Sequence, residues 1–110
     1  MSEKHVELAG GIAAETRNPL AAHAAFFEEW LPKAKAALAR EATASLTIIL
    51  PPAPSDHDAW RRALAGDLAR EYTPKRVNIA AGAPGQALDT VLTYLADAPG
   101  VTGHYVQAHD

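Results

Sequence analysis

The sequence predicts an α/β domain with a mostly parallel sheet of about four strands and helices on both sides of it, in three layers. Short apolar, β-branched runs alternate along the chain with segments of helical periodicity. The connections between these runs are long enough for right-handed crossovers between parallel strands. A length of 110 residues suits one domain over residues 1–110, with a core that needs neither disulfides nor metal.

The first elements are a short strand over residues 5–9 and a helix over residues 19–40. Pro19 is a favoured first helical residue, because its missing N–H would have no partner there. Pro32 removes the N–H that would reach Glu28, so we expect a kink or break near Leu31.

The helix over 19–40 has more apolar surface than packing on one sheet face requires. The stripe that we assign to the core comprises Leu20, Ala24, Phe27, Leu31, Ala34 and Leu38. A second stripe beside it comprises His23, Phe26, Trp30 and Ala37. Phe26 and Trp30 therefore either extend the core or contact a second molecule.

A buried strand is predicted over residues 46–50, and three prolines in 51–54 end it. Ser55, with Asp58 three residues on, is a candidate N-cap for a helix over 55–72. The expected core stripe of this helix comprises Trp60, Leu64 and Leu68. Its flank of small residues, on which another helix could pack closely, comprises Ala59, Ala63 and Gly66.

The remaining elements are a strand over 76–81, a tight turn over 82–85, a helix over 86–96 and a last strand over 105–108. The helix has the clearest periodicity in the chain, through Leu88, Val91, Leu92 and Leu95. Pro99-Gly100 ends it.

Composition excludes several classes of function. The formal net charge of −3 argues against nucleic-acid binding, and no apolar run approaches the ~20 residues that cross a bilayer. The absence of cysteine excludes a disulfide scaffold, a zinc ribbon and a thiol nucleophile. We therefore expect a cytoplasmic protein that binds neither nucleic acid nor membrane.

Two groups of polar residues have competing interpretations. Asp56, His57 and Asp58, with Ser55 beside them, contain the residue types of a hydrolytic triad. Neighbours on one helical turn point in different directions, however, so capping is the favoured role. The five histidines show no ligand spacing such as HExxH, and we expect no metal site.

The turn at 82–85 lies between a buried strand and a helix, where backbone N–H groups can hold an anion. Gly82, Gly85 and Gln86 are the candidate contacts for a phosphate or nucleotide. A plain tight turn is the favoured alternative, and the sequence contains neither GxGxxG nor GxxxxGK[ST].

The stretch 64–82, centred on LAREYTPKRVN, resembles the short-chain dehydrogenase/reductase family, in which a helix ending in L-A-x-E precedes a strand beginning R-V-N. Residues 92–95 and the VTGH sequence at 101–104 are similar to that family's last helix and its turn into the final strand. Residues 27–32 and 48–49 resemble its fourth helix and fifth strand. The resemblance implies a Rossmann-like fold, of which this chain matches the C-terminal half.

The catalytic residues of that family are missing at the positions that match. Its Tyr-x-x-x-Lys motif falls on Pro54 and Asp58, and its serine falls on Pro51-Pro52, with Ser55 nearby. Asn18 lies near the position of the family's asparagine but out of register. The resemblance therefore implies no catalytic residue, no cofactor and no hydride transfer by this chain alone.

In that family the fourth and fifth helices pack across a two-fold axis. The resemblance implies the same for the helices over 19–40 and 55–72, with Phe26, Trp30, Ala59, Ala63 and Gly66 as the candidate interface of a homodimer. The leading hypothesis is a non-catalytic, self-associating binding or regulatory module. The alternatives are a nucleotide-binding or enzyme subunit that a partner chain completes, using the 82–85 loop, and a structural partner of another protein.

Overall fold

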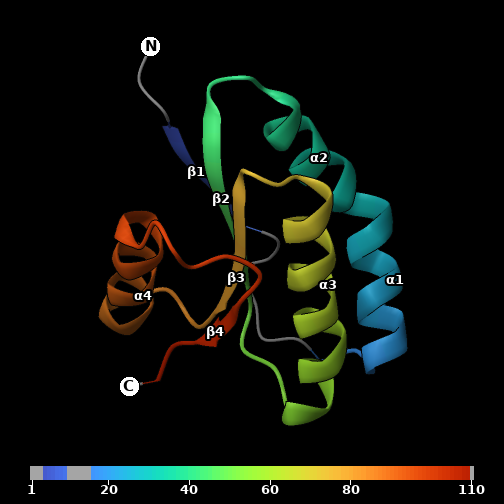
Figure 1. Cartoon of the computed structure of the whole chain (residues 1–110). Coiled ribbons are helices and arrows are strands. Elements are labelled where there is room, and N and C mark those ends of the chain that lie inside the picture. Colours follow the sequence, from blue (N-terminus) through green and yellow to red (C-terminus); the bar gives the residue numbers. More distant parts are fainter. Residues whose placement is uncertain (1–3, 10–15, 110) are drawn as a thin grey trace.

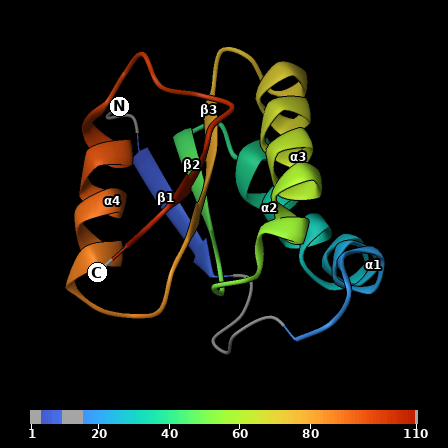
Figure 2. The ribbon, with the colours of Figure 1, turned by 90° about the horizontal axis from the view of Figure 1, so that it is seen from below.

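In the computed structural model, which describes residues 4–9 and 16–109, a parallel four-stranded sheet has the strand order β1-β2-β3-β4 (Figure 1). The strands are β1 (Lys4–Ala9), β2 (Thr43–Leu50), β3 (Arg76–Ala81) and β4 (Tyr105–Gln107). The helices are α1 (Pro19–Glu29), α2 (Leu31–Ala39), α3 (Asp58–Glu71) and α4 (Gln86–Asp97), and the short 3-10 helix η1 (Ser55–His57) precedes α3. Figure 2 shows α1, α2 and α3 on one side of the sheet and α4 on the other. The predicted three-layer α/β architecture is confirmed.

The helix predicted over 19–40 is two helices that meet at Trp30. Pro32 lies in the first turn of α2, where its missing N–H breaks no helical hydrogen bond. The expected break near Leu31 is therefore confirmed. At the other end of α1, the Asn18 side chain caps the helix, because its Oδ1 accepts a hydrogen bond from the Ala21 N–H at 2.8 Å.

The face that α1 turns toward the core differs from the prediction. Phe26 is 3% exposed, whereas Leu20 is 81% exposed and Phe27 46% exposed. The two stripes of α1 have thus exchanged roles: Phe26 packs in the core, and Leu20 and Phe27 face outward. The break at Trp30 explains the error, since α1 no longer has to share its core face with α2, where Leu38 is buried as predicted.

β2 begins at Thr43, three residues before the predicted start, and alternates between the two faces of the sheet. Leu46 and Ile48 pack toward α1–α3, while Ser45 and Thr47 face the α4 side and are buried. His5 of β1 satisfies both hydroxyl groups: its Nδ1 lies 2.6 Å from Ser45 Oγ and its Nε2 lies 3.4 Å from Thr47 Oγ1. Because one face of the strand carries polar residues here, the continuous apolar run in the sequence begins only at Leu46.

The environment of His5 predicts a loss of stability at acidic pH. Burial lowers the pKa of His5 below its ordinary value of 6.5, opposed by Glu7 and assisted by Arg76. The unfolded chain then binds more protons than the folded one once the pH falls below 6.5, so the free energy of unfolding decreases from there down to the folded-state pKa. Urea unfolding between about pH 7.5 and about pH 5.5 measures this loss. The His5→Asn variant should lose less stability over that range, and an equal loss would contradict the assignment.

The start of α3 corrects the predicted cap. Ser55 makes no capping hydrogen bond, and α3 begins at Asp58 after the 3-10 turn of η1. Leu64 and Leu68 are buried as predicted, but Trp60 is only half-buried and Arg61 takes the fully buried position beside it. α4 and β3 match their predicted ranges within one residue, and β4 ends one residue earlier than predicted.

Candidate functional site

The resemblance assigns the family's Tyr-x-x-x-Lys motif to Pro54 and Asp58, which lie just before η1 and at the start of α3. Pro54 is exposed and precedes η1. The Asp58 carboxylate accepts a hydrogen bond from Gln107 Nε2 at 2.8 Å and lies 4.0 Å from the Arg62 guanidinium. The start of α3 therefore carries a carboxylate that Gln107 and Arg62 engage.

The neighbouring Ser55, Asp56 and His57 do not form a triad. Ser55 and Asp56 are exposed, whereas His57 is buried and its Nδ1 accepts a hydrogen bond from Trp60 Nε1 at 3.2 Å. His57 lies in η1, and because Trp60 of α3 occupies its Nδ1, that nitrogen is not free to act as a base for Ser55. Nowhere in residues 4–9 and 16–109 do three His, Asp or Glu side chains gather as metal ligands would.

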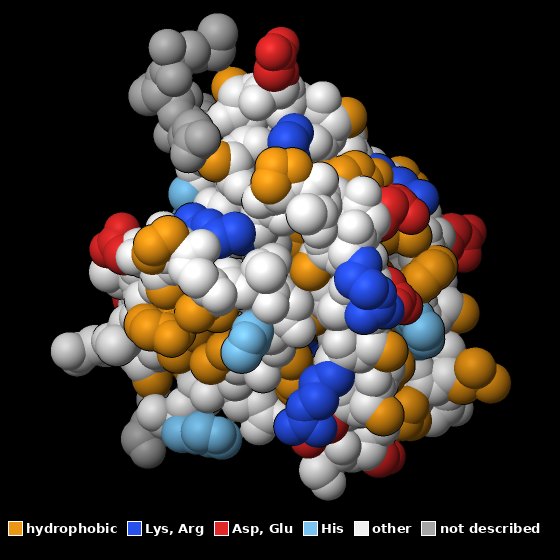
Figure 3. Space-filling model, viewed as in Figure 1, with side chains coloured by type: hydrophobic (Ala, Val, Ile, Leu, Met, Phe, Trp, Pro, Cys, Tyr) orange, Lys and Arg blue, Asp and Glu red, His pale blue; other side chains and the backbone are white. Residues whose placement is uncertain are grey.

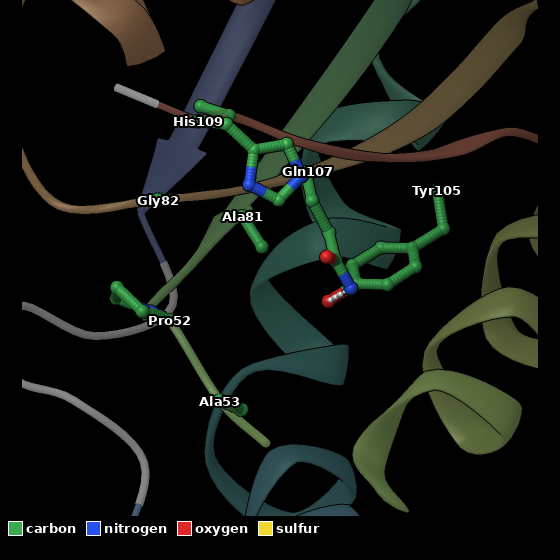
Figure 4. A pocket seen from close by; sticks show the side chains of 8 residues that line it. Pro52, Ala53, Ala81, Gly82, Tyr105, Gln107 and His109 are labelled. Atoms are coloured by element: carbon green, nitrogen blue, oxygen red, sulfur yellow. Dashed lines mark hydrogen bonds between the residues drawn. The ribbon is translucent and has the colours of Figure 1, made fainter. Parts of the chain in front are cut away.

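A pocket of about 230 Å³ lies at the carboxyl ends of β2, β3 and β4 (Figure 4). This end of a parallel sheet is where α/β proteins bind ligands. Its wall includes Pro52 after β2, Gly82 after β3, and Tyr105 and Gln107 from β4. Gly82 is required there, since a Cβ on it would lie 2.9 Å from the Ala108 Cβ. In Figure 4 the Tyr105 hydroxyl and the Gln107 amide meet inside the pocket.

A buried polar network supports this pocket from α3. Arg61 is 0% exposed, and its Nη1 donates to the Pro51 carbonyl at 2.9 Å and to the Tyr105 hydroxyl at 3.1 Å. Gln107 Nε2 links the Tyr105 hydroxyl, at 3.4 Å, to Asp58, at 2.8 Å. No motif in the sequence indicates this network. Its one local signal is that Arg61 stands three and seven residues before Leu64 and Leu68, on their buried stripe.

Of the three loop residues predicted to contact an anion, one lines the pocket. Gly82 lines it, but Gly85 and Gln86 are not among its lining residues. Gly85, with a φ of 153°, precedes α4, and Asp89 lies in the first turn of that helix. The Asp89 carboxylate already complements the helix dipole and would repel a phosphate there.

The second candidate site is an apolar surface formed by α1, α2 and α3, which we call the α1–α3 face. It includes the exposed side chains of Leu20 and Phe27, and His23, which stacks on Trp60 with ring centroids 4.9 Å apart. A groove of about 190 Å³ runs between the helices, with Phe27 and Ala63 in its wall. Figure 3 shows hydrophobic side chains along the α1 side of the molecule, beside charged side chains over α3.

The five predicted interface residues differ in how far they are exposed to solvent. Ala59 and Ala63 are exposed on α3, and Trp30 is half-buried with Lys33 Nζ 4.1 Å from the centre of its ring. Gly66 lies beneath the turn at Gly103, because a Cβ on Gly103 would come within 3.7 Å of the Gly66 Cα. Phe26 is in the core and is unavailable for a contact between molecules, which corrects that part of the prediction.

Comparison with known families decides the relationship. A family model described as short chain dehydrogenase-like protein matches residues 11–108. The chain belongs to this short chain dehydrogenase-like family. No curated protein and no solved structure matches the chain. Across the described ranges, no helix of this family member has the length and apolar character needed to cross a membrane.

Proposed function

We propose that this short chain dehydrogenase-like protein is a non-catalytic module that acts by self-association, as a homodimer formed through the α1–α3 face. The observation that supports this most strongly is the outward placement of Leu20, at 81% exposure, and Phe27, at 46%, on one helix. Exposed apolar side chains that adjoin a groove are typical of interaction surfaces. The dimer would serve a binding or regulatory role in the cytoplasm, where the absence of cysteine suits a reducing environment.

The non-catalytic part of the proposal rests on Pro54 and Asp58. A proline has no hydroxyl proton to transfer, and Asp58 is held by Gln107 at 2.8 Å and supplies negative rather than positive charge. Neither residue can act as the acid or the cation of a reductase. The chain therefore retains the family's scaffold without its proton-transfer pair.

The charges around the groove favour a second copy of the chain as the occupant. Lys35 borders the groove from α2, and Asp67 and Glu71 border it from α3. A two-fold axis brings the same patch of both copies together, so Lys35 of each copy can meet the acidic residues of the other. The exposed small side chains of Ala59 and Ala63 let a helix of the second copy approach α3 closely.

A charge placed on this face should dissociate the dimer. Phe27→Glu and Ala63→Glu each bury an unpaired carboxylate at the proposed interface, and we expect the dimer dissociation constant to rise roughly a hundredfold, about 2.8 kcal/mol. Tyr94→Glu is the matched control, since Tyr94 is 56% exposed on α4, across the sheet from the proposed interface. Sedimentation velocity measures the association, and circular dichroism verifies folding. Dimers of unchanged affinity in folded Phe27→Glu and Ala63→Glu would refute the proposed interface.

The open edge of the sheet supports the alternative of a subunit completed by a partner chain. Within the described residues β1 pairs only with β2, so its other edge can accept a further strand. In that case the partner would supply the remaining nucleotide contacts beside the 82–85 loop. Co-purification of a different chain distinguishes this alternative from a homodimer.

A further inference from the structure

We propose that the pocket at the ends of β2, β3 and β4 binds a small carboxylate through the Tyr105 hydroxyl, backed by the buried charge of Arg61. The site is independent of the α1–α3 face and of the proposed dimer. It uses residues that lie outside the positions matching the family's catalytic motif.

Arg61 carries a buried positive charge that lacks an acidic partner among the described residues. Its side chain is 0% exposed, and among the described residues it forms no ion pair. Its Nε has no hydrogen-bond partner there. Buried charges in proteins are normally paired, because an unpaired ion loses its hydration without compensation. A bound anion near Tyr105 would provide the missing negative charge.

The Tyr105 hydroxyl faces two hydrogen-bond donors within the protein. Its oxygen accepts from Arg61 Nη1 at 3.1 Å and lies 3.4 Å from Gln107 Nε2, and both nitrogens are donors only. The phenolic proton must then be donated to a different atom, and no described side chain or carbonyl accepts it. Tyr105 lines the pocket, so an acceptor oxygen of a ligand can take that proton as a hydrogen bond.

Two arginines flank the Tyr105 ring beside a small pocket. The guanidinium carbons of Arg61 and Arg62 lie 5.8 and 6.0 Å from the centre of the Tyr105 ring. Asp58 is the opposing charge, and Gln107 Nε2 and Arg62 engage it. The pocket of about 230 Å³ has room for a short carboxylic acid.

The role of His109 follows from its position at the pocket. The imidazole lines the pocket together with Gln107 and Ala108 (Figure 4). Its ring N–H is a second hydrogen-bond donor available to the ligand carboxylate. A neutral amide could accept the same hydrogen bonds but would gain no attraction from the Arg61 charge, so the site should discriminate by charge.

The test is a titration of ¹⁵N-labelled protein, followed by nuclear magnetic resonance, with acetate, propanoate and butanoate at constant ionic strength. The matched neutral probes are acetamide, propanamide and butanamide. We expect saturable shifts of the Gly82, Gln107 and Ala108 amide signals with at least one carboxylate, and roughly tenfold weaker binding of its amide. Absence of saturable shifts, or equal binding of acid and amide, would overturn the proposal.

A pair of conservative variants assigns the contact. Tyr105→Phe removes only the hydroxyl and should weaken carboxylate binding roughly tenfold, whereas Tyr94→Phe on the exposed surface of α4 should leave it unchanged. Equal affinity in folded Tyr105→Phe would show that the hydroxyl does not bind the ligand. If Tyr105→Phe does not fold, the comparison of acids with amides on the unaltered chain decides the matter. A negative result here leaves the association of the α1–α3 face unaffected.

Discussion

Phe26→Ala is expected to lower the free energy of unfolding by about 3–5 kcal/mol, the largest effect of any single change considered. Phe26 is 3% exposed and belongs to the core cluster between the sheet and α1–α3, with its ring centroid 6.1 Å from that of Trp60. Truncation would remove the ring and leave a cavity that its neighbours fill only in part.

The adjacent Phe27 provides the control for this prediction. Phe27→Ala should cost much less than Phe26→Ala, since 46% of Phe27 is already exposed. Both substitutions are best measured by urea unfolding in an Ala63→Glu background, so that association does not contribute to apparent stability. If Phe27→Ala cost as much as Phe26→Ala, the orientation of α1 described above would be wrong.

Arg76→Met is expected to lower the free energy of unfolding by about 2–3 kcal/mol. The Arg76 guanidinium donates hydrogen bonds to the carbonyls of Leu95, Ala96 and Ala98, at 3.0, 3.3 and 2.8 Å. It thereby satisfies the carboxyl end of α4, which has no basic residue in its last turn. Methionine keeps the length and apolar stem of the side chain but donates none of these bonds.

The surface residue Arg70 is the matched control for Arg76. It is exposed and, among the described residues, pairs only with Asp67 on the same helix, so Arg70→Met should change stability by less than about 0.5 kcal/mol. Hydrogen exchange in the last turn of α4 should accelerate in Arg76→Met alone. Equal stability of the two variants would show that this helix end does not depend on Arg76.

Lys75, which precedes Arg76, binds the carboxyl end of a helix on the opposite face of the sheet. Its Nζ lies 2.5 Å from the Leu38 carbonyl and 2.6 Å from the Arg40 carbonyl, at the end of α2. Two consecutive basic residues at the start of β3 thus stabilise the carboxyl ends of helices in both outer layers. This gives a physical reason for the basic residues in the KRVN segment that contributed to the family resemblance.

Elements with strong local signals could be predicted from the sequence. The spacing of Leu88, Leu92 and Leu95 predicts α4. A continuous apolar run that follows Pro74 and Lys75 predicts β3. Because these elements alternate, the parallel sheet and its crossovers followed as well. Pro32 correctly located the break between α1 and α2.

The facing of α1 could not be predicted, because its two apolar stripes have similar spacing. Leu20 and Phe27 belong to one stripe and His23 and Phe26 to the other, and only the docking of α1 beside α3 selects between them. Ser55 illustrates a different difficulty. Its sequence suits a cap, but the prolines before it lead into η1, and the helix begins three residues later.

The pocket network was beyond sequence analysis, since its members are far apart in the chain. Arg61 and Tyr105 are 44 residues apart, and Asp58 and Gln107 are 49 apart. No periodicity relates positions that meet only when β4 pairs with β3. Gly82 was identified as a loop residue, but the polar groups that accompany it come from α3 and β4 rather than from the loop itself.

The proposed association of two copies of the chain is tested by its molar mass in solution. Light scattering behind size exclusion, over a series of micromolar concentrations, should give twice the 11.6 kDa of one chain. A mass of one chain at every concentration would rule out the homodimer, and so would a stable complex with a different polypeptide in place of the second copy.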